Sequence, residues 1–210
     1  MPAYSIAAVH SEFSAAQSRV SSLLTTARTL QSPNGHHIHV RYLEELAGLG
    51  LLKLTLAWET FLEETFLRYL CGAKSSAGVA PNLVVARAST LGSAYQNELA
   101  GKLFLTWNPT GAMKRANRCF TAGAPYDPVI SGAAGDLNDM IAIRNRIAHR
   151  SPYSVQEFQS VVRRHLTFVP KGMTPGRFLL TPLPQHGGVI ALDRFTSILS
   201  ASAHLISNHV

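Results

Sequence analysis

The sequence has little cysteine, which limits the chemistry that it can carry. Cys71 and Cys119 are its two thiols, and they do not stand in the paired spacing of a metal or redox motif. We therefore expect neither a thiolate metal site nor a redox pair. So few thiols in a chain of this length fit a reducing, cytoplasmic setting.

Long apolar runs and several well-known catalytic motifs are also missing. No stretch approaches the roughly 20 apolar residues of a membrane span, and the first residues lack a basic start followed by an apolar run. We therefore expect neither export nor membrane insertion. The absence of a Gly-rich phosphate loop, a G-x-S-x-G elbow and a Cys/His nucleophile spacing excludes P-loop nucleotide hydrolysis and serine-type acyl transfer.

Acidic residues are scarce in the second half of the chain. Residues 1–100 balance seven Lys or Arg with seven Glu, whereas residues 101–210 set twelve Lys or Arg against five Asp or Glu. The net charge of +7 therefore lies in the second half. Phosphates are attracted to such a surface over roughly a Debye length of about 8 Å. This asymmetry suggests a polyanionic partner.

Apolar side chains at helical spacing dominate the chain. They make up 46% of 210 residues, enough for one domain with an ordinary core. Steps of three and four residues predict an all-α fold, with Gly48 and Gly50 as points that could disturb the longest helix. The predicted helices cover residues 3–31, 40–71, 81–100, 111–121, 136–150, 154–166 and 191–208. We expect an irregular insertion at about 101–135 and an extended or looped segment at 167–190.

The predicted helix 136–150 carries the segment "IRNRIAH", in which polar and apolar residues alternate closely. At about 100° per residue, Asn138, Asn145 and His149 fall within roughly 40° and form a polar stripe. Ala142 and Ala148 flank this stripe. The opposite face carries the core residues Met140, Ile143 and Ile147.

The small residues beside the stripe would let another helix approach closely, and the same helix of a second copy is the expected partner. Two copies would place two Arg144 and two His149 side chains in one basic cleft. An imidazole can then move protons at a ribose 2′-hydroxyl or a leaving oxygen. A guanidinium can stabilise the phosphate oxygens as charge develops on them. This chemistry needs no metal and no cofactor.

The segment "RNRIAH", which contains Arg144, Asn145 and His149, resembles the motif of the HEPN superfamily. The helix "LTLAWETFLEETFLRYL" and the following "WNP" resemble the HEPN group related to the RiboL-PSP proteins. HEPN domains are all-helical, and many are metal-independent endoribonucleases or toxins whose cleft forms at a homodimer interface. The resemblance implies a single HEPN-like domain over 1–210.

The resemblance also implies roles and a setting. His149 would act as the acid-base group, Arg144 would stabilise the transition state, and Asn145 would position one of them. RNA would be the substrate, and an antitoxin or defence protein a possible partner. Where some HEPN toxins have a modified Tyr, this chain has Ser151. Two other functions stay open: a catalytically inactive HEPN module that binds RNA, a nucleotide or a protein, and an antitoxin or immunity partner.

Further residues are candidates for a supporting role. Arg146 and Arg150 in the motif helix, and "KRANR" with nearby aromatics, could hold RNA. The pair Glu59 and Glu63 could supply an acidic helper or form a solvated helix face. The "HHIH" segment follows a breaker and lacks a second ligand cluster, so we expect no metal there. The "KRANR" segment contributes Lys114, Arg115 and Arg118, with Phe104 and Trp107 as the aromatics, and the "HHIH" histidines are residues 36, 37 and 39. A second basic cluster, Arg163, Arg164 and His165, could likewise flank an RNA groove.

Overall fold

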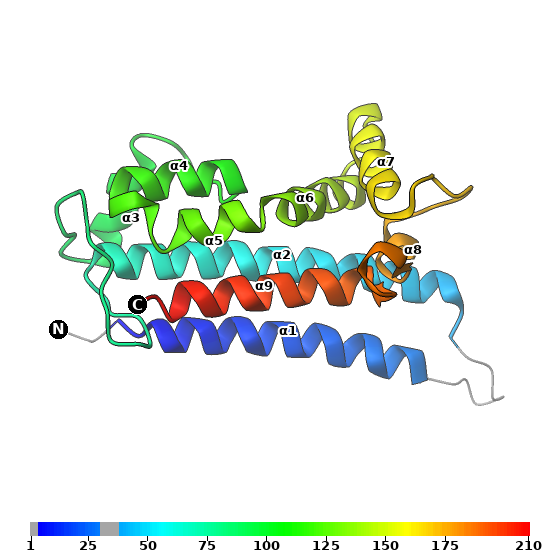
Figure 1. Cartoon of the computed structure of the whole chain (residues 1–210), viewed down its shortest axis with the longest axis horizontal. Helices are drawn as coiled ribbons and strands as arrows, with labels where there is room; N and C mark the ends of the chain where they lie inside the picture. The colour runs from blue at the N-terminus through cyan, green and yellow to red at the C-terminus, as the bar shows by residue number, and fades with distance from the viewer. Residues whose placement is uncertain (1–3, 30–37) are drawn as a thin grey trace. The chain divides into compact units, whose positions relative to one another are not determined.

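The all-α prediction is confirmed by a computed structural model that describes residues 4–29 and 38–210 (Figure 1). The elements, in chain order, are α1 (Ile6–Thr29), α2 (Val40–Leu70), α3 (Leu91–Leu99), α4 (Pro109–Cys119), η1 (Thr121–Gly123), α5 (Tyr126–Gly132), α6 (Ala134–Ala148), α7 (Pro152–Leu166), α8 (Pro175–Leu179), β1 (Pro182–Leu183), η2 (Pro184–His186), β2 (Val189–Ile190) and α9 (Ala191–Ser207). The predicted helices 40–71, 154–166 and 191–208 agree with α2, α7 and α9 to within two residues. The breaker that precedes "HHIH" in the sequence, "SPNG", lies outside the described residues.

The described residues group into two compact units. The first unit comprises residues 4–14, 57–137 and 199–210. The second comprises 15–29, 38–56 and 138–198. Four helices, α1, α2, α6 and α9, contribute a segment to each unit, so the chain passes repeatedly from one unit to the other.

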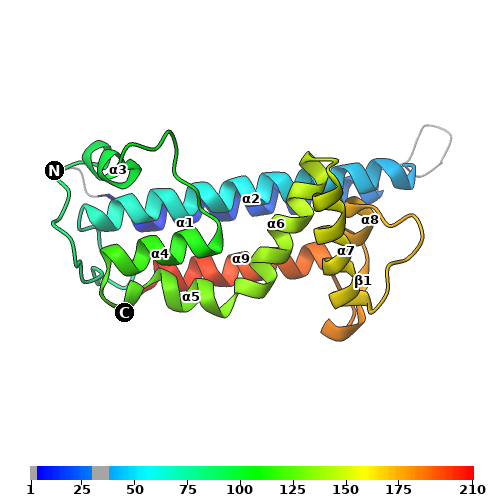
Figure 2. The ribbon, with the colours of Figure 1, turned by 90° about the horizontal axis from the view of Figure 1, so that it is seen from above.

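The first unit has an aromatic core. Segments of α1, α2 and α9 lie side by side in it, and α4 and α5 lie along α2 (Figures 1 and 2). Phe66 of α2 is fully buried and contacts the rings of Trp107, Phe120 and Tyr126 at centroid distances of 5.1 to 5.4 Å. Aromatic rings in tilted or edge-to-face pairs stabilise a core beyond what the burial of their surface contributes.

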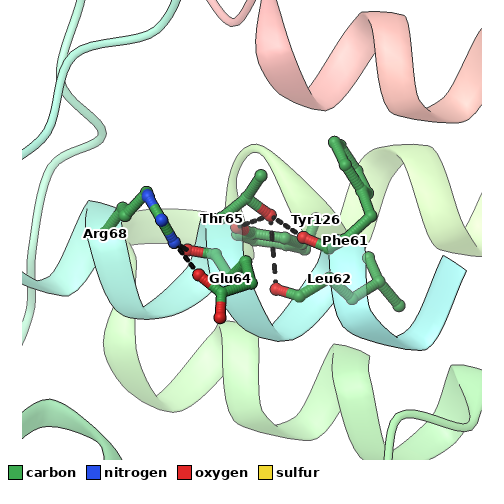
Figure 3. A network of polar contacts seen from close by, with 6 residues as sticks. All are labelled: Phe61, Leu62, Glu64, Thr65, Arg68 and Tyr126. Carbon is green, nitrogen blue, oxygen red and sulfur yellow. Dashed lines mark hydrogen bonds and ion pairs between the residues drawn. The ribbon is translucent and has the colours of Figure 1, made fainter. Parts of the chain in front are cut away.

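A buried hydroxyl pair joins α2 to α5 inside this core (Figure 3). The Tyr126 hydroxyl donates to Thr65 Oγ1 at 3.0 Å, and Thr65 in turn donates to the Phe61 carbonyl at 2.7 Å. Both side chains are fully buried, so each hydroxyl needs these partners. Burial also raises the pKa of the Tyr126 phenol well above its ordinary value.

The segment 101–135 is more regular than the sequence predicted. Asn108 caps α4 by accepting a hydrogen bond from the Gly111 N–H at 2.7 Å, and Pro109 occupies the first turn. The dipeptide "NP" in "WNP" therefore begins a helix. Helix α5 follows, so the irregular part of this segment is confined to 101–108 and the short link around η1. Gly and Pro here mark the ends of helices.

In the second unit, α2 runs unbroken through its two glycines. A Cβ atom on Gly50 would lie 3.0 Å from the Val20 side chain, and one on Gly48 would lie 3.7 Å from Ile147. Gly50 therefore lets α1 pack closely against α2, whereas a Cβ atom on Gly48 would make only an ordinary contact with α6. The sequence suggested a disturbed helix at this point, and the structure shows close helix packing instead.

The segment 167–190 is looped and extended, as predicted. It holds the five-residue α8 and an antiparallel pair of two-residue strands, in which Pro182 pairs with Ile190 and Leu183 with Val189. Helix α8 is seated against the start of α2 in the same unit. A Cβ atom on Gly176 would lie 1.9 Å from the Glu44 carbonyl oxygen, so only glycine fits there.

Candidate functional site

The two faces of α6 differ as the sequence predicted. Met140 and Ile143 are buried in the second unit, with 1% and 0% of their surface exposed, and Ile147 is partly buried. On the other side, Asn138 and His149 are exposed and Asn145 is half-buried. Burial of the apolar face fixes the helix, so the motif side chains project from a rigid support. The polar stripe is accessible to a ligand.

The two adjacent motif residues are linked by their side chains. The Arg144 guanidinium donates a hydrogen bond from Nη1 to the Asn145 side-chain oxygen at 3.1 Å. Both residues are half-buried. Residues i and i+1 point about 100° apart on a helix, so the long Arg side chain bends back toward the stripe to make this contact. The structure thus brings Arg144 to the polar stripe, as the sequence analysis suggested.

The backbone of His149 is held at the end of α6 while its imidazole is exposed. Its N–H donates to the Asn145 carbonyl at 2.8 Å, which completes the last turn of the helix. Its own carbonyl accepts from Arg146 Nη1 at 3.2 Å and from the Ser154 hydroxyl at 3.0 Å. These contacts satisfy a carbonyl that a helix terminus would otherwise leave unpaired. A solvent-accessible ring on a fixed backbone is suited to proton transfer.

Ser151 and Pro152 begin the next helix immediately after the motif. The Ser151 hydroxyl accepts a hydrogen bond from the Ser154 N–H at 3.2 Å and caps α7, and Pro152 occupies its first turn. Ser151, the position at which some HEPN toxins carry a modified Tyr, therefore has a structural function here. The short link between α6 and α7 adds to the support of His149.

Arg146 and Arg150 line one wall of a groove in the second unit. The groove has a volume of about 720 Å³ and lies between the end of α6, the first turns of α2 and the start of α8. Its remaining lining residues are Arg41, Glu44, Glu45, Gly48, Leu49, Ile147, Thr174, Pro175 and Gly176. The structure therefore brings two predicted RNA contacts together and adds Arg41, which the sequence analysis did not select.

A buried carboxylate on α6 was missed by the sequence analysis. Asp139 is 6% exposed, forms an ion pair with Arg164, and is hydrogen-bonded to His165, whose Nε2 lies 2.8 Å from Asp139 Oδ2. The sequence suggested that the cluster around Arg164 could flank an RNA groove. Arg164 and His165 instead fasten α7 to α6. Asp139 lies one turn before Ile143 on the core face, and an acid on an apolar face is the pattern that would have indicated a buried partner.

Arg115 is buried in the core of the first unit and is therefore not accessible to RNA. It is 8% exposed, its Nε lies 3.1 Å from Glu98 Oε2, and its guanidinium lies 4.6 Å from the Trp107 ring centre. Moving it to a phosphate would remove the buried one of the two arginines that pair with the Glu98 carboxylate. Burial lowers the pKa of Arg115, while Glu98 opposes that shift.

The other members of the "KRANR" segment remain on the surface. Lys114 is exposed, and Arg118 is 56% exposed although it also pairs with Glu98. Phe104 is exposed, whereas Trp107 is buried and cannot stack a base. All of these residues belong to the first unit. The motif residues and the groove belong to the second.

The proposed acidic helpers also lie in the first unit, on α2. The Glu63 carboxylate accepts a hydrogen bond from Trp107 Nε1 at 2.9 Å, which gives it a structural partner. Glu59, one turn earlier, is half-buried. Neither is grouped with the motif in one compact unit. Their role as helpers therefore has no support beyond the spacing that suggested it.

Residues 4–29 and 38–210 contain neither a metal-ligand cluster nor a membrane-spanning helix. In these ranges no three His, Cys, Asp or Glu side chains come together as metal ligands do. His39 accepts a hydrogen bond at Nδ1 from the Arg41 N–H at 3.2 Å, and the histidines at 36 and 37 lie outside the described residues. No helix within the same ranges has the length and apolar character of a membrane span.

Comparison with known proteins adds no relative. No family model, curated protein or solved structure matches the chain. Functional inference therefore depends on the motif residues and on the geometry of the second unit.

Proposed function

We propose that the chain is a metal-independent endoribonuclease of the HEPN type. The observation that carries this proposal is the placement of Arg144, Asn145 and His149 on the accessible face of a helix whose opposite face is buried. Arg144 already contacts Asn145, and the backbone of His149 is held at both its N–H and its carbonyl. Such support keeps a reacting group in place without a cofactor.

The proposed reaction is transesterification at an RNA phosphodiester. The imidazole of His149 takes the proton from a ribose 2′-hydroxyl, and the resulting oxygen attacks the adjacent phosphorus. The bond from phosphorus to the 5′-oxygen then breaks, and a second imidazole gives that oxygen a proton. Arg144 stabilises the charge on the non-bridging oxygens. The products are a 2′,3′-cyclic phosphate and a 5′-hydroxyl.

The second imidazole is proposed to come from another copy of the chain. Ala142 is half-exposed and Ala148 is exposed beside the polar stripe, so neither side chain would prevent the close approach of a second α6. An isologous contact about a two-fold axis would place two motifs in one cleft. Each motif would then supply one proton-transfer group.

The proposed setting follows from the resemblance to HEPN toxins and defence nucleases. An enzyme that cleaves cellular RNA must be restrained, so an antitoxin or a defence partner is part of the proposal. Expression of the active chain by itself is expected to arrest growth, and expression of a His149→Ala variant is not. Harmless expression of both would favour an antitoxin or immunity partner.

Purified protein incubated with mixed RNA in EDTA tests the activity. The wild type is expected to produce fragments that end in a 2′,3′-cyclic phosphate, and His149→Ala and Arg144→Ala are expected to lower the rate by about 100-fold or more. His204→Ala, which removes an exposed histidine of the first unit, is the matched control and should cleave normally. Binding without cleavage by the wild type would identify an inactive module.

A further inference from the structure

A second cavity adjoins the groove beside Arg146 and Arg150. It has a volume of about 590 Å³ and lies between the start of α2, the segment before α8, and α8 with the start of β1. The two cavities share Arg41, Glu44 and Thr174 as lining residues. The two cavities therefore adjoin each other on the second unit, from the end of the motif helix to the start of β1, and we refer to them together as the depression.

Arginines follow this depression along its length. Arg146 and Arg150 line its first part, Arg41 lines both parts, and Arg177 lines the second. We call these four residues the arginine track. Arg41, Arg150 and Arg177 are exposed, and the ion pairs among the described residues are made by other arginines. Three guanidiniums of the track are therefore available to a ligand.

Two carboxylates share the depression and reduce its charge without reversing it. Glu44 accepts a hydrogen bond from the Thr174 hydroxyl at 2.8 Å, which holds one carboxylate oxygen against the segment before α8. Glu45 is exposed on the wall of the groove. Because four arginines face two acids, the depression is net positive, as a surface that follows a phosphate backbone must be.

Tyr42 lies at the edge of the track: it follows Arg41 in α2 and its ring contacts His39, which lines the second cavity, whereas Leu49 lines the groove itself. Tyr42 is 59% exposed and its ring lies edge-on to His39, with 6.5 Å between ring centres. Leu49 is 53% exposed and lines the groove two turns further along α2. An exposed tyrosine next to an arginine is the arrangement on which an unpaired base can stack while its phosphate is held. An acidic peptide would also bind to the arginines, but it has no base to stack on the Tyr42 ring.

We infer that the arginine track binds the backbone of single-stranded RNA and that Tyr42 stacks one of its bases. The inference rests on the proposed function, because the track would guide the RNA substrate of the proposed nuclease to the end of the motif helix. Arg41 and Arg177 bind phosphates of nucleotides that lie at a distance from the cleaved bond. Duplex RNA is disfavoured because its bases are already stacked on one another.

Fluorescence anisotropy with labelled oligouridine tests the track in a His149→Ala background in EDTA. The double variant Arg41→Gln, Arg177→Gln should weaken binding and reduce the slope of log affinity against log salt by about 1 for each phosphate contact that is lost. Tyr42→Leu should weaken binding about 5- to 150-fold and leave that slope unchanged. Arg19→Gln, Arg28→Gln, which removes two exposed arginines of the same unit, is the charge-matched control.

Any of four results would overturn the inference. The track variant could bind like the charge-matched control, Tyr42→Leu could bind like the parent protein, or polyglutamate could displace oligouridine as effectively as unlabelled oligouridine does. Duplex RNA competing as well as single strands would also contradict it.

Failure of the track and failure of the nuclease are distinguishable. If the wild type does not cleave RNA but the track and Tyr42 variants lose binding as stated, the proposed catalysis is wrong and the binding site stands. If RNA is cleaved and the track variants bind like their control, the nuclease stands and the track is wrong. With both correct, the track variant should raise KM more than it lowers kcat.

Discussion

The Arg144 guanidinium donates a hydrogen bond to the side-chain oxygen of Asn145 at 3.1 Å. The residues are neighbours in sequence, so their side chains leave the helix in different directions and the contact requires Arg144 to fold toward the stripe. Asn145 thereby limits the positions open to the one group that is proposed to face the phosphate. The contact assigns Asn145 a positioning role.

Removal of the Asn145 amide should therefore impair catalysis through Arg144. We expect Asn145→Ala to lower kcat on the order of tenfold, the equivalent of about 1.5 kcal/mol for a hydrogen bond to a charged group, and to change KM little. The rate of RNA cleavage in EDTA measures this. In an Arg144→Ala background the same substitution should have almost no further effect. Equal losses in both backgrounds would show that Asn145 acts independently of Arg144.

Gly176 should not tolerate a side chain. Gly176→Ala would place a Cβ atom 1.9 Å from the Glu44 carbonyl, so α8 must move away from α2 at a cost of about 1–3 kcal/mol. The free energy of unfolding in urea measures the change. Gly135→Ala is the matched control, because that glycine lies inside α6 with no atom within 4 Å of an added Cβ, and it should leave stability equal or higher. Similar values for the two variants would contradict the close contact.

Stability should decrease under mildly acidic conditions because of two histidines in the first unit. Burial, with a contribution from His204, lowers the pKa of His10, and burial lowers the pKa of His209. Each folded-state pKa lies below the unfolded value of about 6.5, so the unfolded chain binds protons first. Their stabilising contribution is complete above about pH 6.5 and is lost as the pH falls through the folded values. The urea concentration at the midpoint of unfolding measures this. Between neutral and mildly acidic pH, it should fall less in the double variant His10→Gln, His209→Gln than in the wild type.

The two cysteines should be inert in the folded protein. Cys119 is fully buried, and burial together with the nearby Glu98 raises the pKa of its thiol to about 11. Burial also raises the pKa of Cys71, which is 3% exposed. Since the thiolate is the reactive form, a thiol reagent at pH 8 should label neither residue in buffer and both in denaturant. Labelling in buffer would show that this core opens readily.

The positions of the helices and the two faces of α6 could be predicted from the sequence. Local periodicity determines these features, and Met140 and Ile143 are buried where the period places them. The glycines of α2 were misread because a glycine inside a helix can mark either a disturbance or a close neighbour. The distinction depends on Val20, which is distant in sequence.

The long-range contacts of charged residues could not be predicted from spacing. Arg115 was selected as an RNA contact and is paired with Glu98, and Arg164 was placed near a groove and is paired with Asp139. A basic cluster looks the same in sequence whether its partner is a phosphate or a buried carboxylate. Arg41 and Arg177 were overlooked for the converse reason, because each is isolated in sequence and they meet only where α8 is seated on α2.

The most direct test of the proposed chemistry compares an RNA with the same molecule carrying 2′-deoxyribose at each mapped cleavage position. Both are incubated with the wild-type protein in EDTA, and fragments are quantified at those positions. Nucleophilic attack by the 2′-hydroxyl, with His149 as its base, predicts cleavage of the RNA and no detectable cleavage at the deoxy positions. Equal cleavage of the two molecules, or undiminished cleavage of the RNA by His149→Ala, would contradict the account.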